Sequence, residues 1–433
     1  MLAMTTAATI AVMFVTAKWA TTIPEVAMCV VASIWALIML TGRRVQLAWV
    51  IGPLLGIGVL AALQIVTGST VYAWPTRMAA LYWTGNLATF FVALQFLAER
   101  ELRVRYMDGL VAFAGFAGVF CTIHAITSIA KVYWTYPPGY ETPLFGPFIY
   151  ANQYAAFVEL ILPVAIYGAL TREKWARIGC VLAAAILFGS VLFSASRGGT
   201  ALTLLEIAGV PLLTARRRGI TRQQLVNTGL VLAVAVLWVV VAAGPDKLLA
   251  KINDPGTYGS RMEFNRASLS MIKDRPIQGF GLWNWATVYP GYAAVDDGFY
   301  ANQAHNDWAQ WTVEGGIPML ALMLAVAVWA VPRAIRSGWG VGVLMVLIHC
   351  LWDYPIQRTG VAIVFFTMMA AIAPYGRPKE REEEPQPEED AFGISEAAMA
   401  TGKRLSSMND LPFPQTSPTG GVGAAGAAGS VTG

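Results

Sequence analysis

His305 stands where a long basic loop meets an apolar segment, and it is one of only three histidines in 433 residues. The loop from Gly244 to Pro318 carries several basic residues and includes the polar run Gln303-Ala304-His305-Asn306-Asp307. A neutral imidazole there could take a proton from an attacking hydroxyl, with a neighbouring polar group fixing its tautomer. The alternative is an N-cap or interfacial histidine. We predict that His305 is a general base acting on an anionic, membrane-borne substrate, with Asn306 in support.

Arg197 and Arg261 are the arginines best placed to hold an anion. Arg197 lies in the short connection Ser194-Ala195-Ser196-Arg197-Gly198-Gly199, whose glycines let a ligand approach the backbone closely. Arg261 opens a segment of helical pattern after Gly259-Ser260. A guanidinium binds phosphate oxygens through paired donors and stays charged at any relevant pH. The alternatives are an Arg197 that snorkels to lipid headgroups and a loop helix that rests on the membrane surface.

Several other polar residues are expected to support this site. Arg266 follows Arg261 by five positions, so at most one of the two points inward, and a solvated helix face is the simpler interpretation of Arg266. His349 precedes Asp353 by one helical turn, so these two share a face and could pair. The candidate supporting residues are Arg266, Asn306, His349, Asp353 and Arg358.

The remaining polar and aromatic residues leave alternatives open. An aromatic-rich run from Trp283 to Tyr300 is typical of an interfacial belt, although aromatic rings also stack on sugars. Glu159 and Glu206 fall inside apolar segments, so each should be protonated, paired or lining a wet cavity. No set of carboxylates and histidines has the compact spacing of a metal site, so we expect no metal ion and no cofactor.

Composition identifies the class of protein that positions these residues. Hydrophobic residues make up 56% of the chain and charged residues 13%, too few to coat a soluble surface of this size. Apolar runs of membrane-spanning length recur from end to end, and we predict an all-α polytopic membrane protein with about twelve transmembrane helices. The predicted spans are residues 2–17, 24–41, 45–67, 76–98, 106–130, 148–170, 174–193, 199–214, 223–243, 303–331, 338–353 and 356–374.

Basic residues in the connections predict the orientation. They gather after even-numbered spans, as in Arg43-Arg44 and Arg216-Arg217-Arg218, and such loops stay preferentially cytoplasmic. Both termini are then cytoplasmic, and the 244–302 loop lies on the outer side with Arg197 and Arg358. We therefore expect one transmembrane domain over residues 1–374, followed by a disordered cytoplasmic tail over 375–433 whose composition is too polar and then too small to form a core.

The order of these motifs resembles the O-antigen ligase and O-antigen polymerase superfamily of bacterial envelopes. The resemblance rests on the short-turn Ser-Arg-Gly at 196–198, the loop Arg261 followed by Pro-x-x-Gly-x-Gly at 276–281, and His305-Asn306 ahead of Glu-Gly-Gly-Ile-Pro at 314–318. It covers roughly residues 145–320, including a span that begins near Asn152. Asn265 stands where the family often has tryptophan.

The resemblance implies a GT-C-like membrane fold and an inverting, metal-independent glycosyltransferase in the bacterial inner membrane. It implies a glycan donor on undecaprenyl diphosphate held by Arg197 and Arg261, with His305 as base on the acceptor hydroxyl. The acceptor would be lipid A core or a similar lipid or glycan on the periplasmic side, and membrane lipids but no nucleic acid would be partners. The alternatives are an O-antigen or exopolysaccharide polymerase, a protein O-oligosaccharyltransferase, and, from another class, a lipid-linked glycan flippase or transporter.

Overall fold

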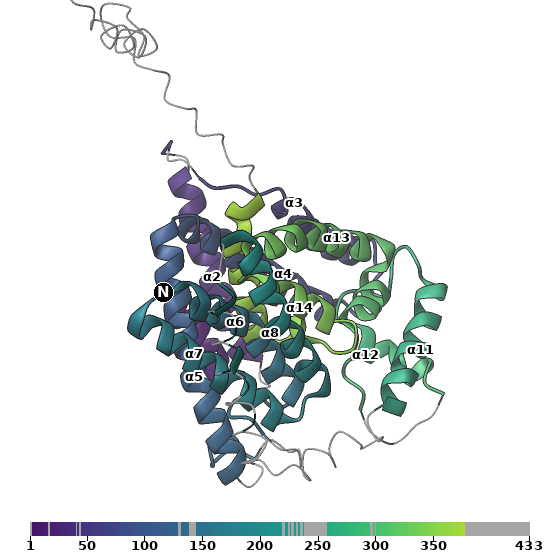
Figure 1. Ribbon diagram of the computed structural model, residues 1–433. Coiled ribbons are helices and arrows are strands. Elements are labelled where there is room, and N and C mark those ends of the chain that lie inside the picture. The colour runs from purple at the N-terminus through teal and green to yellow at the C-terminus, as the bar shows by residue number, and fades with distance from the viewer. Residues whose placement is uncertain are drawn as a thin grey trace, which may run out of the picture. The chain divides into compact units, whose positions relative to one another are not determined.

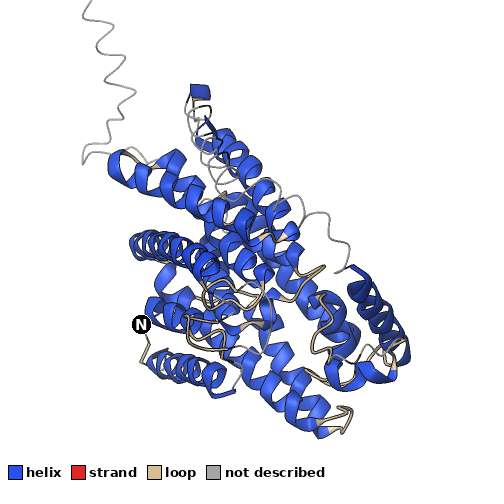
Figure 2. Cartoon of the chain, turned by 90° about the horizontal axis from the view of Figure 1, so that it is seen from below, coloured by secondary structure: helices blue, strands red, loops and turns tan. Residues whose placement is uncertain are grey.

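The fold is built from helices. A computed structural model describes residues 2–15, 18–39, 41–42, 45–128, 131–137, 144–218, 258–294, 298 and 300–376, with single positions between 221 and 237, and no β-strand occurs among them (Figure 2). The α-helices are α1 (Leu2–Ala11), α2 (Lys18–Met39), α3 (Ile51–Val66), α4 (Ala73–Leu97), α5 (Arg100–Thr127), α6 (Ala151–Thr171), α7 (Lys174–Ser194), α8 (Arg197–Arg218), α11 (Tyr258–Asp274), α12 (Trp285–Val288), α13 (Asp307–Ser337), α14 (Val341–His349) and α15 (Thr359–Ile372).

Eight of the described helices are long and apolar enough to cross a membrane, namely α2, α4, α5, α6, α7, α8, α13 and α15. The predicted all-helical, multi-pass membrane protein is thereby confirmed. Each expected span overlaps one of the described helices except the ninth, residues 223–243, most of which lies outside the described residues. The expected loop residues 244–257 and the expected tail beyond Gly376 lie outside them as well, so the count of twelve spans, the tail and the side of the loop stay predictions.

α6 lies at the centre of the helices (Figure 1) and contacts α5, α7, α8, α14 and α15. Its apolar stretch is 89% buried, whereas that of α2 is 11% buried. A helix that is apolar on every side is stable when other helices or lipid surround it, so α6 takes the protein interior and α2 a position exposed to lipid. The first turn of α6 meets the first turn of α8 through a hydrogen bond from Ser196 Oγ to Asn152 Oδ1.

α13 is interrupted at Gly316, and a loop docks at the interruption. Gly316 has φ +66° and ψ −167°, a backbone conformation that is essentially restricted to glycine. The Ile317 N–H donates to the Pro276 carbonyl at 2.8 Å, and the Phe280 N–H donates to the Val313 carbonyl at 3.0 Å. A Cβ at Gly316 would collide with a carbonyl of this loop. The Glu-Gly-Gly-Ile-Pro and Pro-x-x-Gly-x-Gly segments therefore bind each other, backbone to backbone.

Gln64 of α3 fixes this junction to the rest of the bundle. Its amide nitrogen donates to the carbonyls of Gln278, at 2.9 Å, and of Glu314, at 2.8 Å, and its amide oxygen accepts from the Leu282 N–H at 3.1 Å. The side chain is buried, so each of these bonds satisfies a polar group that has no access to water. The loop that follows α11 is thus held at a defined place beside α3 and α13.

The aromatic residues of the loop stabilise α11 (to the right in Figure 1). Trp285 is fully buried, stacks on Tyr289 with ring centroids 4.7 Å apart, and packs edge-on against Phe264 of α11 at 5.7 Å. Its indole nitrogen donates to Ser268 Oγ at 2.9 Å. For Trp285 and Tyr289 the prediction of an interfacial belt or a sugar-stacking surface was therefore wrong, because their rings form a small hydrophobic core of their own.

Candidate active site

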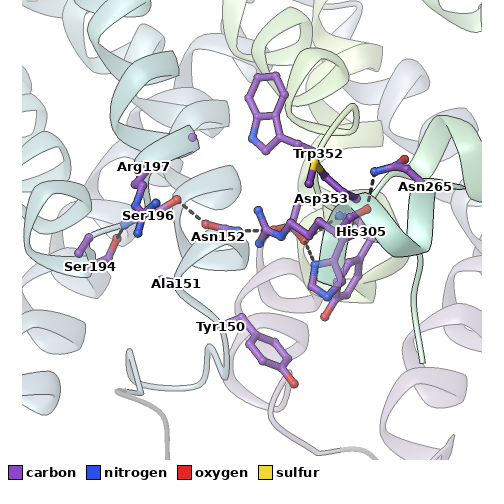
Figure 3. Close-up of a pocket in the computed structure, with 15 residues that line it drawn as sticks. Tyr150, Ala151, Asn152, Ser194, Ser196, Arg197, Asn265, His305, Trp352 and Asp353 are labelled. Carbon is purple, nitrogen blue, oxygen red and sulfur yellow. Dashed lines mark hydrogen bonds and ion pairs between the residues drawn. The ribbon is translucent and has the colours of Figure 1, made fainter. Parts of the chain in front are cut away.

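A cavity of about 690 Å³ opens where the first turns of α6 and α8 meet α11 and the turn after α14 (Figure 3). Arg197, Arg261 and His305 all line it, as does Asp353. These residues come from four separate parts of the chain. The fold therefore brings the predicted phosphate-binding and proton-accepting residues to one cavity.

Asp353 is the central residue of this cavity. Its carboxylate accepts a hydrogen bond from the Asn152 side-chain amide and lies 3.4 Å from the Arg261 guanidinium. The other carboxylate oxygen accepts from the Tyr354 N–H at 2.9 Å and lies 3.6 Å from His305 Nδ1. Asp353 is buried, so these partners replace water around its charge. The expected supporting role of Asp353 is consistent with this position, which also links the arginine and the histidine.

His305 is held between two aromatic rings just before α13. Its ring stacks on Phe264 at 6.0 Å and meets Tyr354 edge-on at 4.9 Å, while Nδ1 faces Asp353. Its backbone is left-handed, with φ +50°, a strained conformation for a non-glycine residue. Asn306, and not His305, is the N-cap of α13, because its side chain accepts from the Ala309 N–H at 3.0 Å. The N-cap alternative for His305 is thus excluded.

The charge of Asp353 is maintained by its neighbours. Burial by itself would raise the pKa of Asp353, but the facing His305, together with His349 and Arg261, lowers this pKa well below its ordinary value. Asp353 is therefore a carboxylate throughout the pH range in which a neutral imidazole can act as a base. A carboxylate facing Nδ1 favours the tautomer with the proton on that nitrogen, which leaves Nε2 able to accept one.

The turn before α8 positions Arg197 at the wall of the cavity (left in Figure 3). Ser196 Oγ donates to Asn152 Oδ1 at 2.6 Å and accepts from the Gly199 N–H at 3.1 Å. The Asn152 amide nitrogen in turn donates to Asp353. Ser196 and Asn152 therefore connect the arginine-bearing turn to the carboxylate that faces His305.

Gly198 and Gly199 lie at close contacts of α8. A Cβ on Gly198 would collide with the Trp352 indole, and a Cβ on Gly199 would collide with the Ala155 side chain of α6. Both glycines let α8 approach α6 and the turn after α14 closely. Gly198 also lines the cavity, so the interpretation that a ligand approaches its backbone stays a prediction, whereas Gly199 does not line the cavity.

α11 presents Arg261 to the cavity because its opposite face is bound to the aromatic core. Arg261 and Asn265 are four residues apart on one helix face and both line the cavity. Asn265 stands where the O-antigen ligase and polymerase superfamily often has tryptophan. Its side-chain oxygen accepts a hydrogen bond from the Asn306 side-chain amide at 2.9 Å. Arg266 is exposed and does not line the cavity, so of the two arginines only Arg261 lines it. This position favours the solvated-face interpretation of Arg266 over a supporting role.

Comparison with known protein families adds an independent observation. Residues 182–324 match the family model described as O-antigen ligase. This segment of the chain is similar to the O-antigen ligase family. The predicted resemblance to this superfamily is confirmed, and no curated protein matches the chain. Arg197, Arg261 and His305 all lie within the matched segment.

The segment that matches the family model does not contain the whole cavity. Asn152 lies before the matched segment and Asp353 lies after it, yet the first donates to the second across 201 positions of the chain. Tyr354 and Trp352 also line the cavity from outside the match. The site therefore depends on α6 and on the turn after α14 as much as on the matched segment.

His349 takes a different partner from the one the sequence suggested. Its Nδ1 lies 2.8 Å from the Glu159 carboxylate of α6, and both side chains are fully buried. Asp353, the partner expected one turn away, faces His305 instead. His349 does not line the cavity, so the hypothesis of a His349–Asp353 pair was wrong. Glu159 is therefore paired, which was one of the three alternatives for a carboxyl group inside an apolar segment. The buried Glu206 carboxylate has no hydrogen-bond partner among the described residues.

The remaining predicted residues lie beside the cavity. Arg358 is outside it, where its guanidinium lies 5.1 Å above the Tyr354 ring. Asp307 turns away from His305 and accepts from the Gln357 amide at 2.5 Å. Within the described part of the chain, no group of three His, Cys, Asp or Glu side chains is arranged to hold a metal ion.

Sequence reasoning missed the residues that orient the others. Asn152 entered only as part of a motif, and Tyr354, Phe264 and Ser196 were not singled out as site residues. Small polar and aromatic residues of this kind are common in apolar chains, so residue type alone gave no signal. The hydrogen bond between Asn152 and Asp353, across 201 positions, could have been found only from the fold.

Proposed function

We propose that this protein moves a glycan from an undecaprenyl diphosphate carrier to an acceptor hydroxyl, as a glycosyltransferase of the O-antigen ligase type. The observation that carries the proposal is the presence of Arg197, Arg261 and the Asp353-paired His305 around one cavity of about 690 Å³. The match to the O-antigen ligase family model supports the same superfamily. Transfer to a hydroxyl needs a base at the acceptor and positive charge at the leaving group, and this cavity supplies both.

The reaction is a single displacement at the anomeric carbon. The acceptor oxygen forms a bond to that carbon while its proton passes to Nε2 of His305. The bond from the anomeric carbon to the donor phosphate oxygen breaks, and its electron pair leaves with the diphosphate. The configuration inverts because no enzyme nucleophile takes part.

Arg197 and Arg261 stabilise the charge that develops on the diphosphate. A guanidinium offers paired donors in the geometry of phosphate oxygens, and its charge persists at any relevant pH. Arg261 also lies 3.4 Å from Asp353, so the group that binds the leaving phosphate contacts the carboxylate that orients the base. Asp353 stabilises the imidazolium that forms when His305 takes the proton.

Membrane location and substrate are part of the proposal. The donor is anchored in the bacterial inner membrane by its polyprenyl chain, and the acceptor is a lipid- or glycan-borne hydroxyl such as that of lipid A core. The cavity would face the periplasm, with both termini in the cytoplasm. Ligase, polymerase and protein oligosaccharyltransferase would share this chemistry and differ in the acceptor.

The test is transfer by the purified protein. We would supply an undecaprenyl-diphosphate-linked glycan with lipid A core, a second lipid-linked glycan or a peptide, and measure which acceptor gains sugar. His305→Ala should lose about two to four powers of ten in transfer rate while donor binding persists. Lys273→Ala, at an exposed residue of α11, is the matched control and should transfer at close to the wild-type rate.

Two results would contradict the proposal. If His305→Gln transfers glycan at the wild-type rate, the imidazole is not the base. If the protein in vesicles moves lipid-linked glycan across the membrane without forming any new glycosidic bond, the transporter alternative is correct.

A further inference from the structure

A second cavity, of about 490 Å³, lies beside the first. It is lined by the end of α1, the start of α4, the 300–303 segment and the 357–360 segment. The two cavities share no lining residue within the part of the chain that the structure describes. The proposed reaction has two substrates, and the first cavity accounts for the diphosphate of only one of them.

One layer of side chains separates the second cavity from His305. Gln303 lines it two residues before His305. Arg358 also lines it, donates to the Tyr354 hydroxyl at 3.2 Å and lies 5.1 Å above the Tyr354 ring. Tyr354 in turn contacts the His305 ring and lines the first cavity. A ligand in the second cavity would therefore lie next to the proposed base.

Two buried polar atoms around this cavity have no hydrogen-bond partner among the described residues. They are Gln303 Oε1 and Arg358 Nε. Neighbouring amides are fixed by contrast, since Gln310 donates to Gln357 at 3.2 Å and to Glu314 at 2.9 Å. A buried polar group left unpaired costs free energy, so a small side-chain movement that paired Gln303 Oε1 or Arg358 Nε with a ligand in the cavity would be favourable. A ligand rich in hydroxyl groups could supply both partners.

Aromatic rings and aliphatic side chains complete the lining. Tyr72, Trp74 and Trp283 line the cavity, and Trp74 is 54% exposed although it is large and apolar. The Trp283 backbone is left-handed, with φ +60°, a strained conformation that other contacts must maintain. Val12 and Met13, at the end of α1, form the aliphatic part. The aromatic rings suit the apolar faces of sugars, and the amides and the guanidinium suit sugar hydroxyl groups. The aliphatic side chains suit the lipid part of a ligand.

We infer that the second cavity is the acceptor subsite and that it binds the saccharide of a lipid-borne acceptor. This inference rests on the proposed function. A single displacement requires the acceptor to enter opposite the leaving diphosphate, and the diphosphate belongs with Arg197 and Arg261 in the first cavity. His305 lines the first cavity, so the ligand of the second cavity would extend its reacting hydroxyl past Tyr354 to reach it.

Gln303→Ala and Trp74→Ala test the inference. Neither removes a hydrogen bond identified within the protein, because Gln303 Oε1 has no described partner and Trp74 is largely exposed. The matched controls are Gln278→Ala and Trp175→Ala, which change exposed residues outside both cavities. The probes are lipid A core, a second undecaprenyl-diphosphate-linked glycan, and core oligosaccharide released from its lipid.

Both test variants should raise the apparent KM for the lipid-borne acceptor by about three- to tenfold, as expected for one lost hydrogen bond or ring contact, and leave the donor KM unchanged. The controls should change neither. The released oligosaccharide should bind more weakly than the lipid-borne one in the wild type.

An unchanged acceptor KM in both variants of an active protein would overturn the acceptor subsite and leave the proposed function intact. A raised donor KM would assign the cavity to the donor glycan, and equal affinity for released and lipid-borne saccharide would remove the lipid from the inference. A wild-type protein that transfers nothing to any acceptor would end the proposed function and this inference with it.

Discussion

Replacing Asp353 by asparagine is the sharpest test of the proposed base. Asparagine keeps the size of the side chain and one carbonyl oxygen, but it removes the charge that faces His305 Nδ1 at 3.6 Å. His305 would then lose both the orientation of its tautomer and the partner of its protonated form. We expect transfer to slow while the helices around the cavity stay assembled.

The magnitude follows from the distance. At 3.6 Å and an effective dielectric constant of about 20, an imidazolium and a carboxylate attract each other by about 4.6 kcal/mol. Solvent screens part of this, since the His305 side chain is 26% exposed. Taking roughly half, about 2.3 kcal/mol, gives a loss of about fiftyfold in transfer rate.

The assay is the rate of transfer from undecaprenyl-diphosphate-linked glycan, with kcat and the donor KM measured separately. Removal of the carboxylate should lower kcat and leave the donor KM close to the wild-type value, because the imidazolium that forms at His305 loses its partner. A purely structural role for Asp353 would instead lower the thermal unfolding midpoint and the amount of folded protein. Asp108→Asn is the matched control, because Asp108 also pairs with an arginine, Arg172 at 2.7 Å, but lies outside both cavities.

A double-mutant cycle supplies the refuting result. If Asp353 acts through His305, then adding Asp353→Asn to His305→Ala should cost little beyond His305→Ala alone. Additive losses in the double variant, or an unchanged kcat in Asp353→Asn, would show that the two residues do not work as a unit.

Three further outcomes are expected. Arg197→Lys keeps the charge but loses the planar donor pair, so transfer should fall by about one to three powers of ten, and near-normal turnover would return Arg197 to a lipid-headgroup role. Gly316→Ala should lower the thermal unfolding midpoint and abolish transfer, because φ +66° is unfavourable for alanine and the added Cβ meets the loop backbone; Gly58→Ala, with open space at that position, should do neither. In a background without the four native cysteines, Ser260→Cys should react with an impermeant maleimide from the periplasmic side and Glu173→Cys only after permeabilisation, and the reverse pattern would place the cavity in the wrong compartment for a periplasmic transferase.

Much of the fold class and part of the site could be predicted from the chain because they depend on local properties. Hydropathy and length are read one segment at a time, and they predicted the membrane helices to within a few residues at most ends. The suitability of a guanidinium for phosphate pointed to Arg197 and Arg261, and the scarcity of histidine in the chain pointed to His305. All three residues line one cavity. The break in α13 at Gly316 was not predicted, because residues 303–331 were expected to form one span, although Pro318 cannot donate the helical hydrogen bond that Glu314 would accept.

The pairing of charges could not be predicted in this way. His305 and His349 could pair with any of several buried acids among the described residues, and the chain by itself favoured His349 with Asp353, four positions apart. The structure pairs His349 with Glu159, 190 positions away, and Asp353 with His305. Which pairs form depends on where α6, α14 and the start of α13 lie in space. The number of positions between two residues in the sequence does not tell which helices are neighbours or which of their residues face each other.

The sequence by itself therefore determined the class of protein and the residue types available for phosphate binding and proton transfer, because these follow from composition and from short-range pattern. The tertiary structure decided which of those residues face the same cavity, which carboxylate orients His305, and that Arg358 belongs to a second cavity beside Tyr354. The physical reason is that burial, ion pairing and cavity shape arise from contacts between segments hundreds of residues apart, as between Asn152 and Asp353.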